Sequence, residues 1–256
     1  NVSKVSVVGI GMAEQSGVSD RMFRALATNQ INIHMITTSQ IKISVLVDRE
    51  QALEAINAVH QTFELDTICP DAVPAESPQA TPATDPAAAA NELQGMEELA
   101  ITDISLDSTQ ASISIHGVAD QPGIAATIFE KVAQENIIVD MIIQSYLDDI
   151  EIASLSFTVD RKDVERTLAV INGIQTEVPF QKVVSNPAVA KLSVSGIGLR
   201  SHTGVAIRMF QSLSGADLNI EMINTSEVRV NVVVDDSQGS AGLEALNKAF
   251  EDVIRS

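Results

Sequence analysis

The chain has 256 residues with a hydrophobic content of 45%, which is enough for about two or three small domains. Aromatic residues make up only 3%, so the cores must be largely aliphatic. The formal net charge of −18 argues against nucleic acid or an anionic membrane as a partner, because both bind basic surfaces.

The single cysteine and the length of the apolar runs further restrict the class of protein. With Cys69 as its one cysteine, the chain can form no internal disulfide and no cysteine-rich metal site, so we expect a reducing, cytoplasmic compartment. No apolar run approaches the about 20 residues of a membrane span. The first residues show no signal-peptide pattern, lack an initial Met and already read as a strand, so we expect further sequence upstream.

A duplication links the two ends of the chain. Residues 4–48 and 191–235 align without a gap, and roughly half of the positions are identical. Each copy reads strand, loop, helix, strand, strand, helix. In the first copy these elements are predicted at residues 5–9, 18–28, 32–39, 41–48 and 50–63, the loop lying between the first two.

The apolar positions of the second helix in each copy predict which face is buried. In the first copy they are Leu53, Ile56, Val59 and Phe63, and in the last copy they are Leu243, Leu246, Phe250 and Val253. Residues 67–96 show no hydrophobic period and are rich in Pro, Ala, Thr and Ser, which predicts a flexible linker.

The middle of the chain contains a complete βαββαβ unit. Its predicted elements are strand 110–117, helix 123–134, strands 138–146 and 151–159, helix 162–173 and strand 176–184. This order predicts an α+β fold, a ferredoxin-like antiparallel sheet with two helices on one face. The chain would therefore consist of tandem units of this kind.

The other two units lack a final strand, and one extra strand, 99–106, precedes the middle unit. We expect it to complete the last unit, so that the middle unit is inserted within the last. By the same logic the first unit needs a strand from upstream or from residues 64–68. The predicted boundaries are 1–66, 67–96 (linker), 97–107 (completing strand), 108–186 (inserted unit) and 187–256.

The loop at residues 119–123 indicates a small-molecule site. It leads from a strand into a helix, so free backbone N–H groups gather beside the Asp120 carboxylate. The N–H groups suit a ligand carboxylate and Asp120 suits an ammonium, a combination that favours a free amino acid. The alternative is an ordinary turn, since Pro and Gly are routine at a helix start.

Two other chemistries are not supported. Gly-Ile-Gly at 9–11 and 196–198 mimics a dinucleotide fingerprint, but Glu14 and Ser201 occupy the position of the third glycine and no parallel βαβ unit follows. The four histidines show no metal-ligand spacing, so no metal site is expected.

These motifs together resemble the regulatory ACT domains of aspartate kinases. The middle unit is similar to the first ACT domain of that family in GVADQPGIAATIF, ENIIVDMIIQS and SLSFTV. The last unit is similar to the second ACT domain in VAKLSVSGIGLRSHTGVAIRMF and LNIEMINTSEVRVNVVV, and the first unit resembles that second domain again.

The resemblance implies a regulatory region with duplicated ACT pairs. Nothing matches the Lys-Phe-Gly-Gly segment that opens the kinase domain of this family, so no catalytic residue is expected, and ATP and Mg would belong to the parent kinase. The implied function is feedback inhibition of aspartate-family amino-acid biosynthesis, with L-lysine, L-threonine or both bound at ACT–ACT interfaces. We expect a homodimer through ACT units, in contact with the kinase domain of the same protein.

The resemblance also implies which residues contact the effector. The middle unit supplies the loop, the first helical turn and one strand residue: Asp120, Gln121, Pro122, Gly123, Ile124, Ala125 and Gln144. A neighbouring unit closes the pocket with Asn219, Ile220 and Glu221, for which the first unit has Asn32 and Ile33. The last unit adds a loop and a segment tied to lysine sensitivity: Ser201, His202, Ser226 and Glu227.

The first unit departs from this pattern, because Glu14, Gln15, Ser16 and Gly17 stand where Ser-His-x-Gly is expected. A site of the second type there has been lost or has changed its ligand. Two other functions remain as alternatives. One is a dimerisation scaffold without ligands. The other is an RNA-binding module with the same element order, which the charge and the absence of aromatics on the central strands disfavour.

Overall fold

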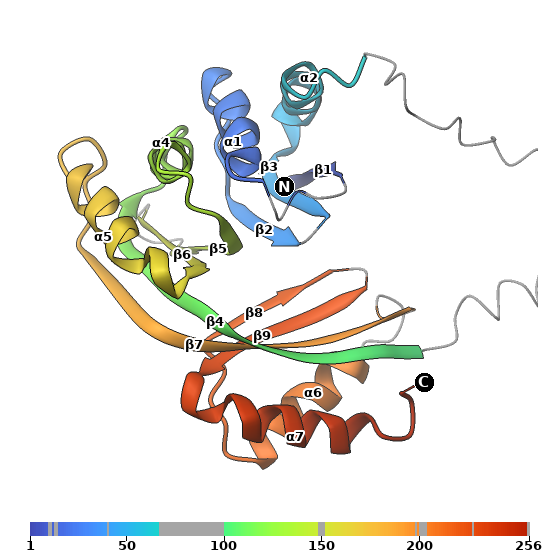
Figure 1. Ribbon diagram of the computed structural model, residues 1–256. Coiled ribbons are helices and arrows are strands. Elements are labelled where there is room, and N and C mark those ends of the chain that lie inside the picture. The colour runs from blue at the N-terminus through green and yellow to red at the C-terminus, as the bar shows by residue number, and fades with distance from the viewer. Residues whose placement is uncertain are drawn as a thin grey trace, which may run out of the picture. The chain divides into compact units, whose positions relative to one another are not determined.

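The computed structural model describes residues 1–9, 12, 15–39, 41–66, 100–147, 152–197, 199, 204–226 and 228–254, which divide into two compact units (Figure 1). The first unit contains residues 1–65 and 107–190, and the second contains the described residues of 66–106 and 191–256. The predicted linker at 67–96 lies outside the described residues.

The first unit begins with the N-terminal copy of the repeat. Its elements are β1 (Val2–Val8), α1 (Val18–Thr28), β2 (Met35–Ser39), β3 (Lys42–Asp48), a 3-10 turn (Arg49–Gln51) and α2 (Ala52–Thr62). Helix α1 has the predicted bounds, whereas β2 begins three residues later than predicted. The residues before β2 form the exit from the helix, where Ile31 N donates to Leu26 O at 3.0 Å.

Helix α1 shows why these sequences fold as they do. Met22, Phe23 and Leu26 recur on one face and are fully buried. The helix starts after Gly17, whose φ of 83° lies in the left-handed region that glycine tolerates. It is followed by Gln30 at a φ of 55°, which turns the chain back towards the sheet.

The middle copy completes the first unit. Its elements are β4 (Ala100–Ala119), α4 (Ile124–Gln134), β5 (Val139–Leu147), β6 (Ile152–Asp160), a 3-10 turn (Arg161–Asp163), α5 (Val164–Gly173) and β7 (Lys182–Ile197). The separate strands predicted at 99–106 and 110–117 are one strand, β4, because no Gly or Pro interrupts residues 100–116.

Strand β7 also differs from the prediction. A strand was predicted at 176–184, but β7 begins at Lys182 and continues to Ile197. The residues after α5 instead stay in turns, since Glu177 N and Val178 N both donate to Ile174 O at 2.9 and 2.8 Å. Strands β4 and β7 therefore each run from one unit into the other.

The sheet of the first unit has the strand order β1-β3-β2-β5-β6-β4-β7. The first copy contributes β1, β3 and β2, and the middle copy contributes the rest. The two copies meet where β2 pairs antiparallel with β5, at Thr37 and Ile143. Helices α1, α2, α4 and α5 lie on one face of this sheet (Figure 1), so the two copies share one helical layer.

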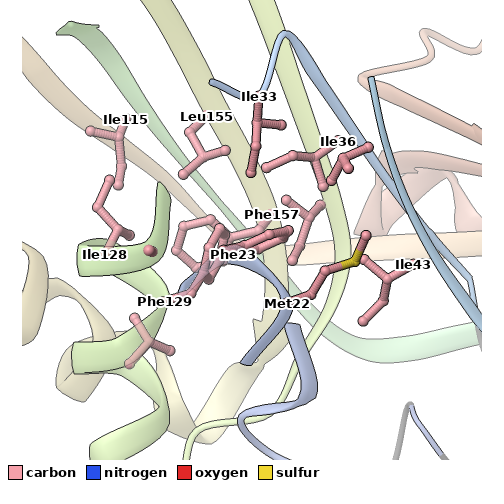
Figure 2. Close-up of a cluster of buried hydrophobic side chains, with 14 of the residues drawn as sticks. Met22, Phe23, Ile33, Ile36, Ile43, Ile115, Ile128, Phe129, Leu155 and Phe157 are labelled. Carbon is pink, nitrogen blue, oxygen red and sulfur yellow. The ribbon is translucent and has the colours of Figure 1, made fainter. Parts of the chain in front are cut away.

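One hydrophobic core runs through both copies. Phe23 of α1 and Phe129 of α4 have ring centroids 5.5 Å apart, and Phe129 meets Phe157 of β6 edge-on at 5.4 Å (Figure 2). Such ring pairs contribute about 0.5–1.5 kcal/mol beyond the area that they bury. The core therefore holds the two copies in one fixed arrangement.

The prediction for α2 was wrong in part. Leu53 and Ile56 are 71% and 50% exposed, and the helix instead buries Ala55, Ala58 and Val59. The inward stripe is thus made mainly of small residues, which let α2 lie close to its neighbours. Leucine and isoleucine on the outer face are an ordinary feature of protein surfaces.

The second unit has the strand order β4-β7-β9-β8, formed by the first residues of β4, the last residues of β7, β8 (Met222–Thr225) and β9 (Arg229–Asp235). It also contains α6 (Gly204–Gly215), a 3-10 turn (Asp236–Gln238) and α7 (Gly239–Phe250). A Cβ on Gly196 would lie 2.3 Å from Ala100 O, so glycine permits the close approach of β4 to β7. Leu246 and Phe250 are buried as predicted, whereas Leu243 and Val253 are half-buried.

Both units are mixed α+β structures with antiparallel strand pairs and helices packed on the sheet, as the sequence predicts. Within the ranges that the structure describes, no helix has both the length and the hydropathy needed to cross a membrane.

Candidate ligand-binding site

A cavity opens where the loop before α4 meets the residues that lead into β2, and we call it the first cavity. Its volume is about 420 Å³ with the open mouth included. It lies entirely within the first unit, between the first and middle copies. Its lining residues are Phe23, Ile31, Asn32, Ile33, Val118, Ala119, Asp120, Gln121, Gly123, Ile124, Ala125, Ala126, Gln144, Ala153 and Leu155.

The loop presents one carboxylate and a helix N-terminus to this cavity. Gly123 has a φ of 95° and caps α4, and Thr127 N donates to Gly123 O at 2.8 Å. The N–H groups of Ala125 and Ala126, in the first turn, have no carbonyl four residues earlier within the helix. They form the positive end of the helix, while Asp120 supplies a negative group beside it.

Gln144 supplies a third polar group, and its orientation is fixed. The side chain is 9% exposed, and its Nε2 donates to Ile33 O at 2.8 Å. Because a carbonyl can only accept, the amide nitrogen must face Ile33 and Oε1 must face the other way. This Oε1 is buried without a hydrogen-bond partner among the described residues. A buried acceptor without a partner costs about 1–3 kcal/mol, so a ligand that donates to it gains affinity.

The structure brings together most of the residues predicted for the pocket and separates others. Asp120, Gln121, Gly123, Ile124, Ala125 and Gln144 line the cavity with Asn32 and Ile33. Pro122 lies in the same loop but is exposed and does not line the cavity. Asn219, Ile220 and Glu221 belong to the second unit, where they precede β8.

The remaining predicted residues also belong to the last copy. Ser226 lies in the second unit, where its N–H donates to Arg229 O at 2.8 Å. Ser201, His202 and Glu227 lie outside the described residues. No group of His, Cys, Asp and Glu that could hold a metal ion occurs within the described ranges.

The apolar wall of the cavity was not predicted. Phe23, Ile31, Val118, Ala126 and Leu155 belong to it, and all five are buried. The sequence contains only a partial signal for this wall. Residues 17–33 of the first copy align without a gap with residues 123–139 of the middle copy, which shows that the two copies are alike. Residues 204–220 of the last copy align with the same stretch, so the match does not show which copy closes the pocket of the middle copy.

The sequence profile of the ACT domain matches residues 5–63, 112–173 and 192–250, which together make up most of the chain. This chain belongs to the ACT-domain family. The three matches correspond to the first, middle and last copies of the repeat.

Curated relatives and solved structures show which ACT proteins this chain resembles. It is 38% identical to an aspartate kinase of Stutzerimonas stutzeri over 161 residues, which are 63% of this chain and 39% of the relative. It is also 38% identical to the aspartokinase of Thermus thermophilus over 153 residues, 59% of this chain and 38% of the relative. The chain thus spans about two fifths of the length of these relatives.

The solved structures agree with this picture. A crystal structure of aspartate kinase from Synechocystis aligns with a TM-score of 0.80 and 32% identity, covering 98% of this chain and 39% of that one. The ligand-free regulatory subunit of the Thermus thermophilus enzyme aligns with a TM-score of 0.56 and 37% identity, covering 59% of this chain and 99% of that one. The three ACT domains therefore correspond to the regulatory part of aspartate kinases.

Proposed function

We propose that this chain is the feedback-sensing region of an aspartate kinase, and that L-lysine, L-threonine or both bind the first cavity. The observation that carries the proposal is the set of three polar groups in that cavity. The N-terminus of α4 suits the ligand carboxylate, Asp120 suits the α-ammonium, and Oε1 of Gln144 suits a donor on the ligand side chain.

This arrangement selects among amino acids by side chain. The hydroxyl of threonine and the terminal ammonium of lysine can both donate to Oε1 of Gln144. An apolar side chain leaves this buried acceptor without a partner, at a cost of about 1–3 kcal/mol. The cavity therefore favours these two amino acids over valine and norleucine, which have similar shapes and no donor.

The position of the cavity gives a route to regulation. One side belongs to the middle copy and the other, at Asn32 and Ile33, belongs to the first copy. A ligand that contacts both changes the free energy of the arrangement that it binds, and shifts the population of the parent enzyme towards that arrangement. The aspartate phosphorylation, with its ATP and Mg, belongs to sequence outside this chain, which itself supplies no catalytic residue and works in the cytoplasm.

Association through ACT domains is the second part of the proposal. In the first copy Ile36 is 1% exposed, within the core that the first and middle copies share. Its equivalent in the last copy, Ile223 of β8, is 45% exposed, and Ile207 of α6 is 54% exposed. We expect another ACT domain, from a second copy of the chain, to cover this surface in a homodimer. Ile223→Asp should then shift the chain towards monomer in sedimentation, and an unchanged dimer would contradict this interface.

The decisive test of ligand binding is calorimetric titration of the chain with L-threonine, L-valine, L-lysine and L-norleucine, and with lysine in the presence of threonine. We expect saturable binding of threonine or lysine, at least about tenfold tighter than that of its apolar analogue. Asp120→Asn and Gln144→Ala should each weaken binding, whereas the exposed control Glu165→Gln should not.

Two outcomes would contradict the proposal. Equal affinity for threonine and valine, and for lysine and norleucine, would remove the role of Gln144. No heat with any of the four ligands, for a chain shown to be folded, would favour a scaffold that pairs without ligands.

A further inference from the structure

The segment that closes the first cavity from the side of the first copy is followed by a histidine. Asn32 and Ile33 line the cavity, and Ile33 O accepts the hydrogen bond from Gln144 that joins the two copies. His34 comes directly after them and does not line the cavity itself. Its backbone N–H donates to Leu46 O of β3 at 2.9 Å, so His34 lies where this segment joins the sheet.

The imidazole of His34 faces a carboxylate. Its Nε2 lies 3.2 Å from Oδ1 of Asp48, the last residue of β3. This contact has the distance of an ion pair but not the geometry of a hydrogen bond, and Nε2 is buried with no hydrogen-bond partner among the described residues. The attraction therefore comes mainly from charge, and it is strong only when the ring is protonated.

The aspartate occurs in all three copies, and the copies use it differently. Asp160 and Asp235 end β6 and β9 as Asp48 ends β3. Asp160 accepts from Lys162 N at 3.1 Å and Asp235 accepts from Ser237 N at 3.0 Å, so both cap the 3-10 turn that follows. The side chain of Asp48 makes no such bond. It can therefore face His34 without giving up a cap.

The residue opposite this aspartate differs as well. The position of His34 is occupied by Asp140 in the middle copy and by Glu221 in the last copy. An acidic side chain cannot form an ion pair with an aspartate, because two negative charges repel each other. The first copy thus differs from the other two in having a proton-dependent ion pair next to a cavity-lining segment.

Other charged or titratable residues lie on the elements around this pair. In the described part of the chain, none of their carboxylates is within ion-pair distance of the His34 ring. The charge of the ring therefore acts mainly on Asp48. The surrounding residues are Lys4 on β1, Arg49 and Glu50 in the 3-10 turn, Glu54 and His60 on α2, Asp140 on β5 and Asp120 in the loop before α4.

We propose that His34 is a positioning residue for the first cavity. Its protonated ring, attracted by Asp48, holds Asn32 and Ile33 where they close the cavity, so that ligand binding strengthens as the pH falls from about 8 to about 6. This inference rests on the proposed function, because it concerns how tightly the same cavity holds its amino acid.

The link between the ion pair and affinity is a matter of populations. A ligand that contacts Asn32 and Ile33 binds the arrangement in which both are in place, and its apparent affinity rises with the population of that arrangement. Protonation of His34 stabilises this arrangement through Asp48. By reciprocity, ligand binding favours the protonated ring, so binding takes up protons.

The expected effect is modest, because water screens the pair. The side chains of His34 and Asp48 are 31% and 55% exposed. Ion pairs of this kind correspond to an increase in affinity of about two- to fivefold at most. Calorimetric titration at pH 6 and pH 8 measures it, with L-threonine, or with L-lysine if lysine alone binds. We expect the parent chain to gain about two- to fivefold in affinity at the lower pH relative to His34→Gln and Asp48→Asn.

The comparison between variants isolates His34 from every other group that titrates in this range. His60→Gln is the matched control, since it removes an imidazole on α2 that does not line the cavity, and it should keep the pH trend of the parent chain. The double variant of His34 and Asp48 should behave as either single variant does, because each substitution already removes the same ion pair.

Two results would overturn the inference while leaving the proposed function in place. One is the same change of affinity with pH in the parent and His34→Gln chains. The other is a loss of affinity in His34→Gln that is equal at pH 6 and pH 8, which would indicate a structural role without a proton. No binding of either amino acid to the parent chain at either pH would instead contradict the proposed function, and the effect on affinity with it.

Unfolding in urea without ligand separates these failures further. A double-mutant cycle of His34→Gln and Asp48→Asn should show coupling between the two residues that is larger at pH 6 than at pH 8. Coupling that is absent at both pH values would overturn the inference even in a chain that binds its ligand, because the ion pair would then not hold the segment.

Discussion

The first and middle copies of the first unit share a backbone and differ in their chemistry. Gln30 and Asn136 follow equivalent helices with φ angles of 55° and 54°, and the capping glycines are equally matched. The side chains differ, with Asp20 in the position of Ala126. The comparison teaches that the backbone of the repeat can stay constant while the side chains that it carries change.

The shared core explains why the frame is constant. Phe23 and Phe129 are equivalent residues of the two copies, and their rings contact each other. Thr37 and Ile143, which pair between β2 and β5, are also equivalent. The two copies thus meet about an approximate two-fold axis.

We expect the largest effect on stability from a substitution that removes packing at this axis. Phe129→Ala removes two ring contacts and leaves a cavity in the common core, so we expect a loss of about 3–5 kcal/mol in the free energy of unfolding. Urea denaturation measures it. Leu53→Ala, on the exposed face of α2, is the control and should change stability by less than about 0.5 kcal/mol.

A polar contact between the copies should have the next largest effect. Gln144→Ala removes the donor to Ile33 O and leaves that carbonyl without this bond, which should cost about 1–3 kcal/mol. The exposed Gln134→Ala on α4 is the matched control. Equal stability of the two variants in urea would show that this hydrogen bond does not hold the copies together.

The capping glycines test the symmetry directly. Gly17→Ala and Gly123→Ala each place a side chain in the left-handed region, so both should cost about 1–2 kcal/mol, and by similar amounts. Neighbouring atoms leave room for a Cβ in both, so the cost is conformational. Gly173→Ala has open space and an ordinary φ, and should not destabilise. Unequal costs at the two caps in thermal unfolding would refute equivalent frames.

The smallest effect is expected in the pH dependence of stability, through Asp20. Burial raises the pKa of Asp20 above its ordinary value of 3.8, so its protonated form stabilises the fold at low pH. That contribution is complete below pH 3.8 and is lost as the pH rises through the raised pKa. Asp20→Asn should therefore gain stability relative to the parent chain as the pH rises to 7, in paired unfolding curves. Glu165→Gln, at an exposed position of α5, is the control variant.

Much of the fold was predictable because local patterns and the core agree. The strand predicted at residues 110–117 is part of β4, in which Ile113 and Ile115 are buried, and the helix predicted at residues 18–28 has the bounds of α1. The pattern failed at α2, where Leu53 and Ile56 were preferred over alanines as the buried face. Periodicity finds apolar residues but cannot tell that a close helix–sheet contact requires small ones.

The loop of the candidate site could be predicted from the sequence, but the copy that completes the pocket could not. The DQPG loop follows from a short motif and Gln144 from the resemblance to ACT domains, whereas the partner residues depend on which copies pair, a property of tertiary packing. The burial of Asp20 was also not predictable because, in the sequence, it is one more charge on an amphipathic helix. Only its burial and its unpaired oxygen distinguish it from a surface residue.

The course of strand β4 has a consequence for synthesis on the ribosome. Its first residues, 100–106, lie beside the end of β7, so they emerge about 90 residues before the strand that they join. At about 5–20 residues per second, this segment waits for several seconds without its partner. The inserted ACT domain can form during that interval and bring the two ends of the last domain together. The first segment of the last ACT domain to be synthesised is thus one whose pairing is delayed until the end of β7 has been made.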